Sequence, residues 1–275
     1  MKIIIGDNPF FGVNHKVGSK KLASKTERFK QASEVIREFK INGVEEIMVS
    51  NHPSLQSFLD TVPSCDIHFV IPYPHKYNDI VAVSGYFGLI RYFLRGFSLQ
   101  SFHKILFNFI RLDFNEIFIR LMIASELQCI GKYKDRVKSL CLHNILVDLC
   151  IASGNVSILK SFHKICKELR IRPVFITQNI RALIESMPDI DYTGCFSFNS
   201  KGYMVNPSID EVLSYLNKNT NLPKLWAMQI MASGSINNDE AIQFISKFNY
   251  FEKVLYATTK KQRVTDFVSL FKKYY

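Results

Sequence analysis

The sequence has few of the features that mark disulfide-rich, secreted or membrane-spanning proteins. None of its six cysteines form a Cys-x-x-Cys pair, and several lie in apolar runs where a free thiol packs as a small hydrophobic group. This usage is typical of a reducing compartment. No uncharged apolar run reaches about 18 residues, so no transmembrane helix is expected. A strand pattern begins at Lys2, so we expect no signal peptide and predict a cytoplasmic protein.

Signatures of nucleic-acid and metal binding are also missing. No RNA- or DNA-binding motif occurs, and neither His-x-His nor His-Glu-x-x-His spacing is present. We therefore expect no specific nucleic-acid partner and no metal, although ligands from separate strand ends would leave no spacing to find. Lys and Arg exceed Asp and Glu by 35 to 24. Because these basic residues are scattered, we interpret the excess as a solvated basic face, with anionic small molecules as the alternative.

The chain does contain a regular alternation of short apolar runs and longer helical patterns. This alternation predicts βαβ units and a parallel sheet. The predicted strands are Lys2–Ile5, Glu46–Val49, Ile67–Ile71, Ser139–Leu142, Pro173–Thr177, Gly194–Phe198, Leu225–Met231 and Lys253–Tyr256. No Gly-x-Gly-x-x-Gly follows the first strand, and polar residues follow nearly every strand, which favours closure over an open sheet. We predict an α/β fold, a single (β/α)8 TIM barrel over residues 1–275.

Residues 77–138 interrupt this rhythm between the third and fourth strands. Their middle part, Phe87–Ile123, is helical in pattern and rich in Phe. Basic residues are interspersed in it, namely Arg91, Arg95, Lys104, Arg111 and Arg120. The insertion is interpreted as a helical pair packed on the barrel, as a lid or homodimer surface, or as an interfacial membrane helix.

Three residues at predicted strand ends are candidates for catalysis. Asp7 follows the first strand, Lys76 the third and His143 the fourth. In a barrel, these positions face the mouth that carries the active site. A carboxylate and an imidazole there can transfer protons, and a desolvated lysine can tune its neighbours. The alternatives are a loop carboxylate that caps backbone amides, a structural histidine and a surface lysine.

Other polar residues of the same loops are candidates for binding a small polar substrate, because amides and imidazoles hold hydroxyl groups well. These are Asn8, His15, Asn51, His75, Asn144, Gln178, Asn199 and Gln229.

The loops after the last two strands predict an anion or phosphate site. Barrels often bind phosphate there with loop amides and a helix N-terminus. The candidates are Ser233, Gly234, Ser235, Thr258, Thr259, Lys260 and Arg263. The alternative is an ordinary Gly/Ser turn followed by a helix cap.

Two of these segments resemble the aldo-keto reductase superfamily. Tyr256–Phe267 is similar to that family's last-strand cofactor segment, which implies that Thr259, Lys260 and Arg263 face the adenosine phosphate of NADPH. Met228–Ile236 is similar in placement, Leu142–Asn144 resembles the family's strand-four histidine segment, and Lys76 is placed like its strand-three lysine. The family's catalytic Tyr and its partner Asp should follow strand two, but Val49–Ser54 contains neither.

Three hypotheses for function follow. The first is an enzyme related to aldo-keto reductases that acts on a small polar, sugar-like or phosphorylated substrate, with NADPH as the candidate cofactor. The second is a cofactor-independent lyase, aldolase, isomerase or epimerase that uses strand-end Asp and His residues as acid and base. The third is a non-catalytic binding or scaffold barrel with the insertion as its contact surface.

Overall fold

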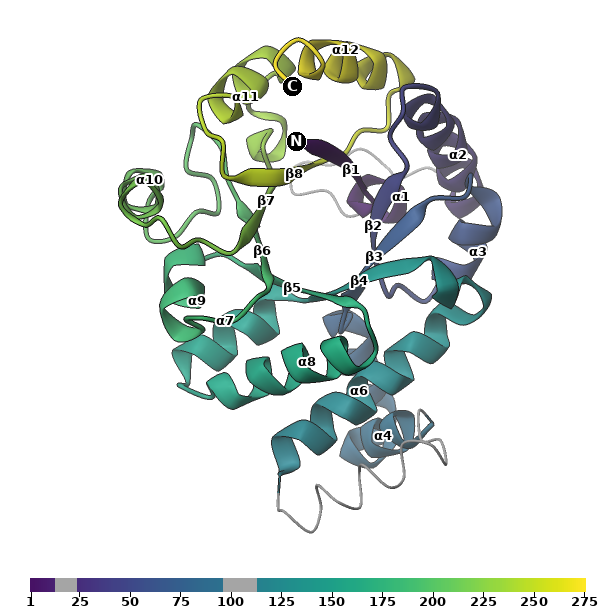
Figure 1. Cartoon of the computed structure of the whole chain (residues 1–275). Helices are drawn as coiled ribbons and strands as arrows, with labels where there is room; N and C mark the ends of the chain where they lie inside the picture. Colours follow the sequence, from purple (N-terminus) through teal and green to yellow (C-terminus); the bar gives the residue numbers. More distant parts are fainter. Residues whose placement is uncertain (13–23, 96–112) are drawn as a thin grey trace.

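Eight parallel strands close into a barrel in sequence order, as predicted, in a computed structural model that describes residues 1–12, 24–95 and 113–275. His15, Lys104 and Arg111 lie outside the described residues. Figure 1 shows helices surrounding the ring of strands. The strands are β1 (Lys2–Gly6), β2 (Glu46–Ser50), β3 (Asp66–Ile71), β4 (Val137–Leu142), β5 (Arg172–Thr177), β6 (Thr193–Ser197), β7 (Lys224–Met228) and β8 (Phe251–Tyr256).

The strands are apolar on both faces because one face lines the barrel and the other packs under the helices. Ile4, Met48, Val70, Cys141 and Trp226 belong to a buried cluster in the barrel interior. Their sequence neighbours point outward, because side chains alternate along a strand. These neighbours join the larger core that the surrounding helices cover.

Helices follow the strands along the chain. They are α1 (Asn8–Phe11), α2 (Lys25–Ile41), α3 (Leu55–Thr61), α4 (Pro74–Leu94), α6 (Phe114–Ile130), α7 (Asn144–Ala152), α8 (Val156–Glu168), α9 (Ile180–Ser186), α10 (Ile209–Lys218), α11 (Asn238–Ile245) and α12 (Lys261–Phe271), with short 3-10 turns at Gly131–Arg136 and Ala232–Gly234.

Two local predictions were wrong. The polar loop expected after β1 begins with the short helix α1, which has Pro9 in its first turn and ends at Gly12, where φ is 80°. Proline fits the first turn of a helix, and glycine fits its left-handed end. Strand β7 ends at Met228, three positions before the predicted Met231. Gln229 has a φ of 53°, and this left-handed backbone cannot continue a strand.

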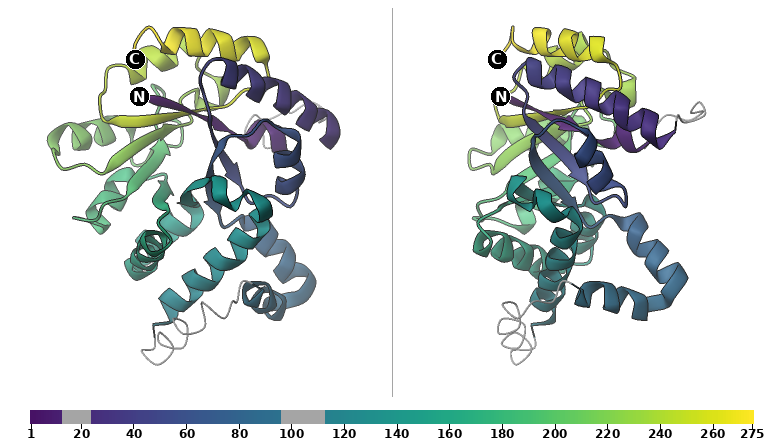
Figure 2. Two further views of the ribbon diagram at one scale, coloured as in Figure 1. Left: turned by 45° about the vertical axis from the view of Figure 1, so that its right-hand side comes forward. Right: turned by 90° about the vertical axis from the view of Figure 1, so that its right-hand side faces the viewer.

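The described part of the predicted insertion between β3 and β4 is helical and contains α4, α6 and the turn that follows. Of the predicted helical pattern Phe87–Ile123, α4 covers the part up to Leu94 and α6 covers the part from Phe114. Asp113 caps α6 by accepting the Glu116 amide at 3.0 Å. The right-hand view of Figure 2 shows α4 projecting on the side away from the N-terminus, where the strands end. Within the described residues, no helix is long and apolar enough to cross a membrane.

Candidate active site

Asp7 lies at the carboxyl end of β1 and is almost completely buried. Its side chain accepts the backbone N–H of Ser50 at 2.7 Å, which joins the ends of β1 and β2. Burial raises the pKa of Asp7 to about 7, although the hydrogen bonds to Ser50 oppose the shift. Both protonation states of this carboxyl group are therefore accessible near neutral pH, which suits a group that exchanges protons.

His143 lies at the carboxyl end of β4, where its backbone N–H donates to Ile71 O at 2.8 Å. It has the same strand parity as Ser139 and Cys141, so the alternation directs it toward the barrel axis. The Nδ1 atom accepts the Ile145 N–H at 3.2 Å. Burial and the nearby His75 lower the pKa of His143 to about 4. The ring is thus neutral at pH 7 and carries its proton on Nε2, as a hydrogen-bond donor.

Aromatic rings connect the loops after β1, β2 and β3. His52 stacks on Phe11 with ring centroids 4.6 Å apart. Tyr73 contacts His52 at 5.5 Å and the exposed His75 at 5.4 Å. Since His75 also acts electrostatically on His143, this row of rings reaches the end of β4.

Lys76 belongs to a buried polar cluster, which we call the Glu126 cluster and define as Asn51, Lys76, Tyr77, Tyr92 and Glu126. The Lys76 ammonium lies 3.0 Å from the Glu126 carboxylate, whose side chain is 0% exposed. Lys76 also donates to the Tyr92 hydroxyl at 2.7 Å. Glu126 accepts further hydrogen bonds from Asn51, from Tyr77 at 2.6 Å and from Tyr92 at 3.1 Å.

The members of this cluster come from the loop after β2, from α4 and from α6, so the insertion is tied directly to the barrel mouth. Sequence reasoning proposed Lys76 and Asn51 but missed Tyr77, Tyr92 and Glu126. The sequence signal that could have identified Glu126 is its position as an acidic residue in an apolar stretch of helix. An acidic residue is buried in such a place only when it is paired, so a buried partner could have been expected.

Asn144 and Gln178 surround a second carboxylate that the sequence did not single out, Asp148 of α7. The Asn144 side chain hydrogen-bonds to Asp148, and the Gln178 backbone N–H donates to it at 3.1 Å. Burial raises the pKa of Asp148, against hydrogen bonds from Thr177, Gln178 and Asn144. These contacts join the carboxyl ends of β4 and β5.

Asn199 and Gln229 organise loops. The buried Asn199 accepts the Tyr203 N–H at 2.9 Å and donates to Tyr203 O at 3.0 Å. Gln229 accepts the Ser197 hydroxyl at 3.1 Å. Asn8, by contrast, is exposed on the first position of α1.

The two predicted phosphate loops differ in what they offer to an anion. After β7, the amides of Ala232, Gly234 and Ser235 donate to carbonyls of their own loop. After β8, the Thr258 hydroxyl accepts the Lys260 N–H at 3.1 Å, and this turn leads directly into α12. Lys260 and Arg263 are exposed there, and neither makes an ion pair within the described part of the chain.

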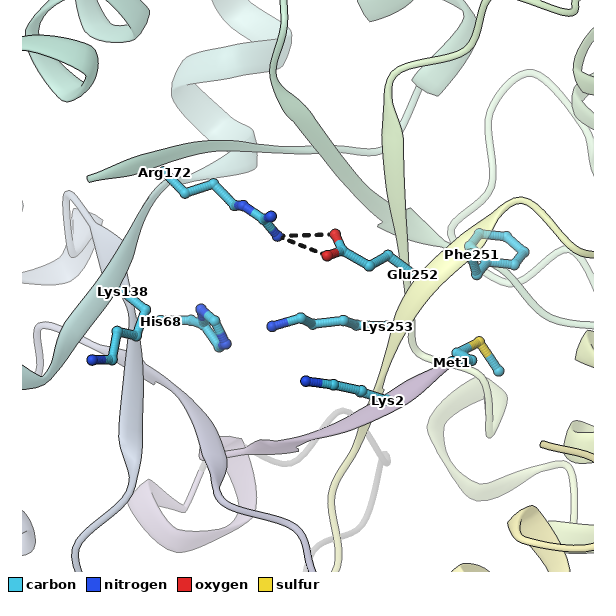
Figure 3. Close-up of a pocket in the computed structure, with 8 residues that line it drawn as sticks. All are labelled: Met1, Lys2, His68, Lys138, Arg172, Phe251, Glu252 and Lys253. Atoms are coloured by element: carbon cyan, nitrogen blue, oxygen red, sulfur yellow. Dashed lines mark hydrogen bonds and ion pairs between the residues drawn. The ribbon is translucent and has the colours of Figure 1, made fainter. Parts of the chain in front are cut away.

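A cavity of about 510 Å³ lies at the amino ends of the strands, opposite the predicted site residues. Figure 3 shows the eight residues that line it, which are Met1 and residues within the first three positions of β1, β3, β4, β5 and β8. Sequence reasoning had placed no function at this end of the barrel. In residues 1–12, 24–95 and 113–275, no group of three or more His, Cys, Asp or Glu could hold a metal ion.

Comparison with solved structures supports the class of fold. Two structures from Pseudomonas aeruginosa, both provisionally described as aldo-keto reductases, match with TM-scores of 0.62 and 0.61. They share 11% and 10% sequence identity with this chain, over 99% of its length and 90% and 89% of theirs. These matches confirm the predicted (β/α)8 fold. No family model and no curated protein sequence matches the chain.

Proposed function

We propose that the chain is an enzyme of aldo-keto-reductase-like ancestry that acts on the carbonyl group of a small polar, sugar-like or phosphorylated substrate, with NADPH as cofactor. The observation that carries this proposal is the buried Lys76–Glu126 pair with its tyrosine partners at the carboxyl end of the barrel. This cluster brings phenol, ammonium and carboxylate groups together from other positions in the chain. The loop after β2, where the aldo-keto reductase pattern has its tyrosine and aspartate, contains neither residue.

The tyrosines of this cluster act as anchors in our proposal. Burial and the negative charge of Glu126 raise the pKa of Tyr77 and of Tyr92, so both phenols stay protonated. Both donate to Glu126 and fix it beside Lys76. The fixed ammonium supplies positive charge near the mouth, where an alkoxide oxygen would develop during reduction.

Asp7 and His143 carry the proton transfer in this proposal. The neutral His143 donates its Nε2–H to the substrate carbonyl oxygen and polarises it. Asp7, with a pKa of about 7, gives a proton to the developing alkoxide, or removes one in the reverse direction. NADPH, when bound, supplies the hydride that the carbonyl carbon receives.

The start of α12 is the part of the chain that fits the phosphate of NADPH. Lys260 and Arg263 lie at its N-terminus, where the helix dipole and unpaired amides favour an anion. The loop after β7 fits less well, because the Ala232, Gly234 and Ser235 amides are already used.

NADPH titration with nicotinamide fluorescence tests the redox proposal. We expect binding that Lys260→Glu weakens by about tenfold or more, since it replaces an attractive charge with a repulsive one. Lys160→Glu is the matched control, because Lys160 is exposed on α8 and has no side-chain partner among the described residues. No binding at about millimolar NADPH, or equal effects of both substitutions, would contradict the proposal.

A cofactor-independent isomerase or lyase is the second candidate, favoured by the pKa of about 7 at Asp7. A carboxyl group poised near neutral pH and a neutral imidazole form an acid–base pair without a nicotinamide. Under this alternative NADPH does not bind, whereas Asp7→Asn and His143→Ala each abolish turnover of the substrate.

A further inference from the structure

The amino-terminal end of the barrel is lined by polar side chains. Side chains alternate along a strand, so the residue two positions before each interior residue also points into the barrel. Together these residues form the next layer toward the amino-terminal end. This layer consists of Lys2, Glu46, His68, Ser139, Arg172, Thr193, Lys224 and Lys253. Barrel interiors are usually filled with bulky branched residues, so a layer with four basic residues and one acidic residue departs from the ordinary pattern.

The hydrogen bonds confirm that members of this layer meet across the barrel. His68 bonds to Ser139 through Nδ1 and to Glu46 through Nε2, both at 2.8 Å. Lys253 also donates to Glu46. Burial raises the pKa of Glu46, but the contacts with His68 and Lys253 prevail and lower it to about 2. Glu46 is therefore ionised and is neutralised by Lys253.

An irregularity in strand pairing adds Glu252 to this end. Leu225 pairs with Phe251 and Trp226 with Lys253, so the ladder skips Glu252. Such a bulge turns an extra side chain toward the site. Glu252 accepts the Trp226 indole N–H at 3.2 Å and the Arg172 guanidinium at 2.9 Å. Figure 3 shows this Arg172–Glu252 pair on one side of the cavity.

Among the lysines and the arginine that line the cavity, Lys2 is the one that none of the described ion pairs includes. Arg172 is paired with Glu252, Lys253 with Glu46, and Lys138 lies 3.5 Å from Asp66 at the rim. The Lys2 side chain has no hydrogen bond or ion pair within the described ranges. Figure 3 shows its ammonium group beside that of Lys253, both directed into the cavity toward His68. The cavity therefore holds an uncompensated positive charge beside further hydrogen-bond donors.

We propose that this amino-terminal cavity is a binding site for a small phosphorylated anion, with the phosphate held by Lys2 and Lys253 and faced by Arg172. The volume of about 510 Å³ fits a small-molecule ligand. Phosphate oxygens accept several charge-assisted hydrogen bonds at once, which matches two ammonium groups and a guanidinium. The site is separate from the proposed catalytic mouth, and it does not depend on the proposed reaction.

The test is calorimetric titration with inorganic pyrophosphate at low ionic strength. We expect Lys2→Glu to weaken binding by about tenfold or more and Lys2→Gln to weaken it by a smaller factor. Lys160→Glu, with the same change of charge, should leave the affinity unchanged. Thermal unfolding of each variant checks that the barrel is intact, and Lys2→Gln provides the comparison if Lys2→Glu does not fold.

Lys260→Glu separates this site from the proposed cofactor site. Pyrophosphate binding that survives Lys260→Glu and is weakened by Lys2→Glu supports the amino-terminal site, whatever the result with NADPH. Pyrophosphate binding that is lost in Lys260→Glu but kept in both Lys2 variants overturns it and assigns the anion to the other mouth. Absence of binding at about 10 mM pyrophosphate also overturns it.

Discussion

At the scale of single residues, the structure gives two polar side chains unusual protonation behaviour. Asp7 follows β1 and His143 follows β4 at the same end of the barrel, and burial drives both toward their neutral forms. A neutral acid and a neutral imidazole can both donate hydrogen bonds to a substrate oxygen. Their environments therefore decide their chemistry, and each gives a separate prediction.

Asp7→Asn should remove a pH dependence of stability. The pKa is raised from 3.8 to about 7, so the folded state keeps a proton that the unfolded chain loses. Stability from this group is complete below pH 3.8 and falls, by up to about 4 kcal/mol, as the pH rises to about 7. Urea unfolding between pH 4 and 9 measures this slope. Asp135→Asn, at an exposed position, should retain the pH dependence of the unmodified protein. If Asp7→Asn also retained it, the raised pKa of Asp7 would be refuted.

His143→Ala should lower kcat by about 10²–10³, the usual loss when one donor to a developing oxyanion is removed. His143→Gln should restore part of the rate, because its amide keeps an N–H donor. Since the pKa of His143 is lowered to about 4 and that of Asp7 is raised to about 7, the titration of the rate near neutral pH should come from Asp7 and should persist in His143→Gln. Carbonyl-dependent oxidation of NADPH, followed between pH 5 and 9, measures these effects. Full activity of His143→Ala would exclude the proposed role.

At the scale of elements, the insertion is held to the barrel by buried polar contacts as well as by apolar packing. Glu126 of α6 accepts hydrogen bonds from Asn51, in the loop after β2, and from α4 residues, while the rings of Phe93 of α4 and Phe118 of α6 pack with centroids 5.5 Å apart. Val83, Tyr86 and Phe87 of α4 remain exposed. The lid and homodimer interpretations of the insertion stay predictions.

Glu126→Gln should destabilise the protein by about 3 kcal/mol or more, because it leaves the Lys76 charge buried without its partner. Glu34→Gln is the matched control on the exposed surface of α2, and it should change stability by less than about 0.5 kcal/mol. Chemical denaturation gives both values. If the two substitutions had equal effects, the Glu126 cluster would not anchor the insertion.

At the scale of the whole molecule, the barrel has polar residues at both ends and an apolar layer between them. The carboxyl ends gather the proposed catalytic groups, and the amino ends gather a basic cavity. The apolar layer of Ile4, Cys141 and Trp226 separates them. The two proposed ligand sites therefore lie at opposite ends of one barrel, and the Lys2 and Lys260 variants test one site each.

The sequence by itself determined the barrel and the approximate ends of its strands, except that of β7. Alternation along strands and helical spacing are local patterns, so they can be recognised without knowing which segments meet. Asp7, Lys76 and His143 were placed at strand ends for this reason. The left-handed backbone at Gln229 was not recognised, because only its conformation in the folded chain ends β7.

Only the tertiary structure decided how charges are paired and buried. Asn51 and Glu126 are 75 positions apart, and Glu46 and Lys253 are 207 positions apart, so no local pattern connects either pair. The pKa of Asp7 depends on burial against Ser50, which is likewise distant in sequence. Desolvation and ion pairing arise from contacts between distant segments, so the chemical character of both mouths became visible only when the barrel was closed.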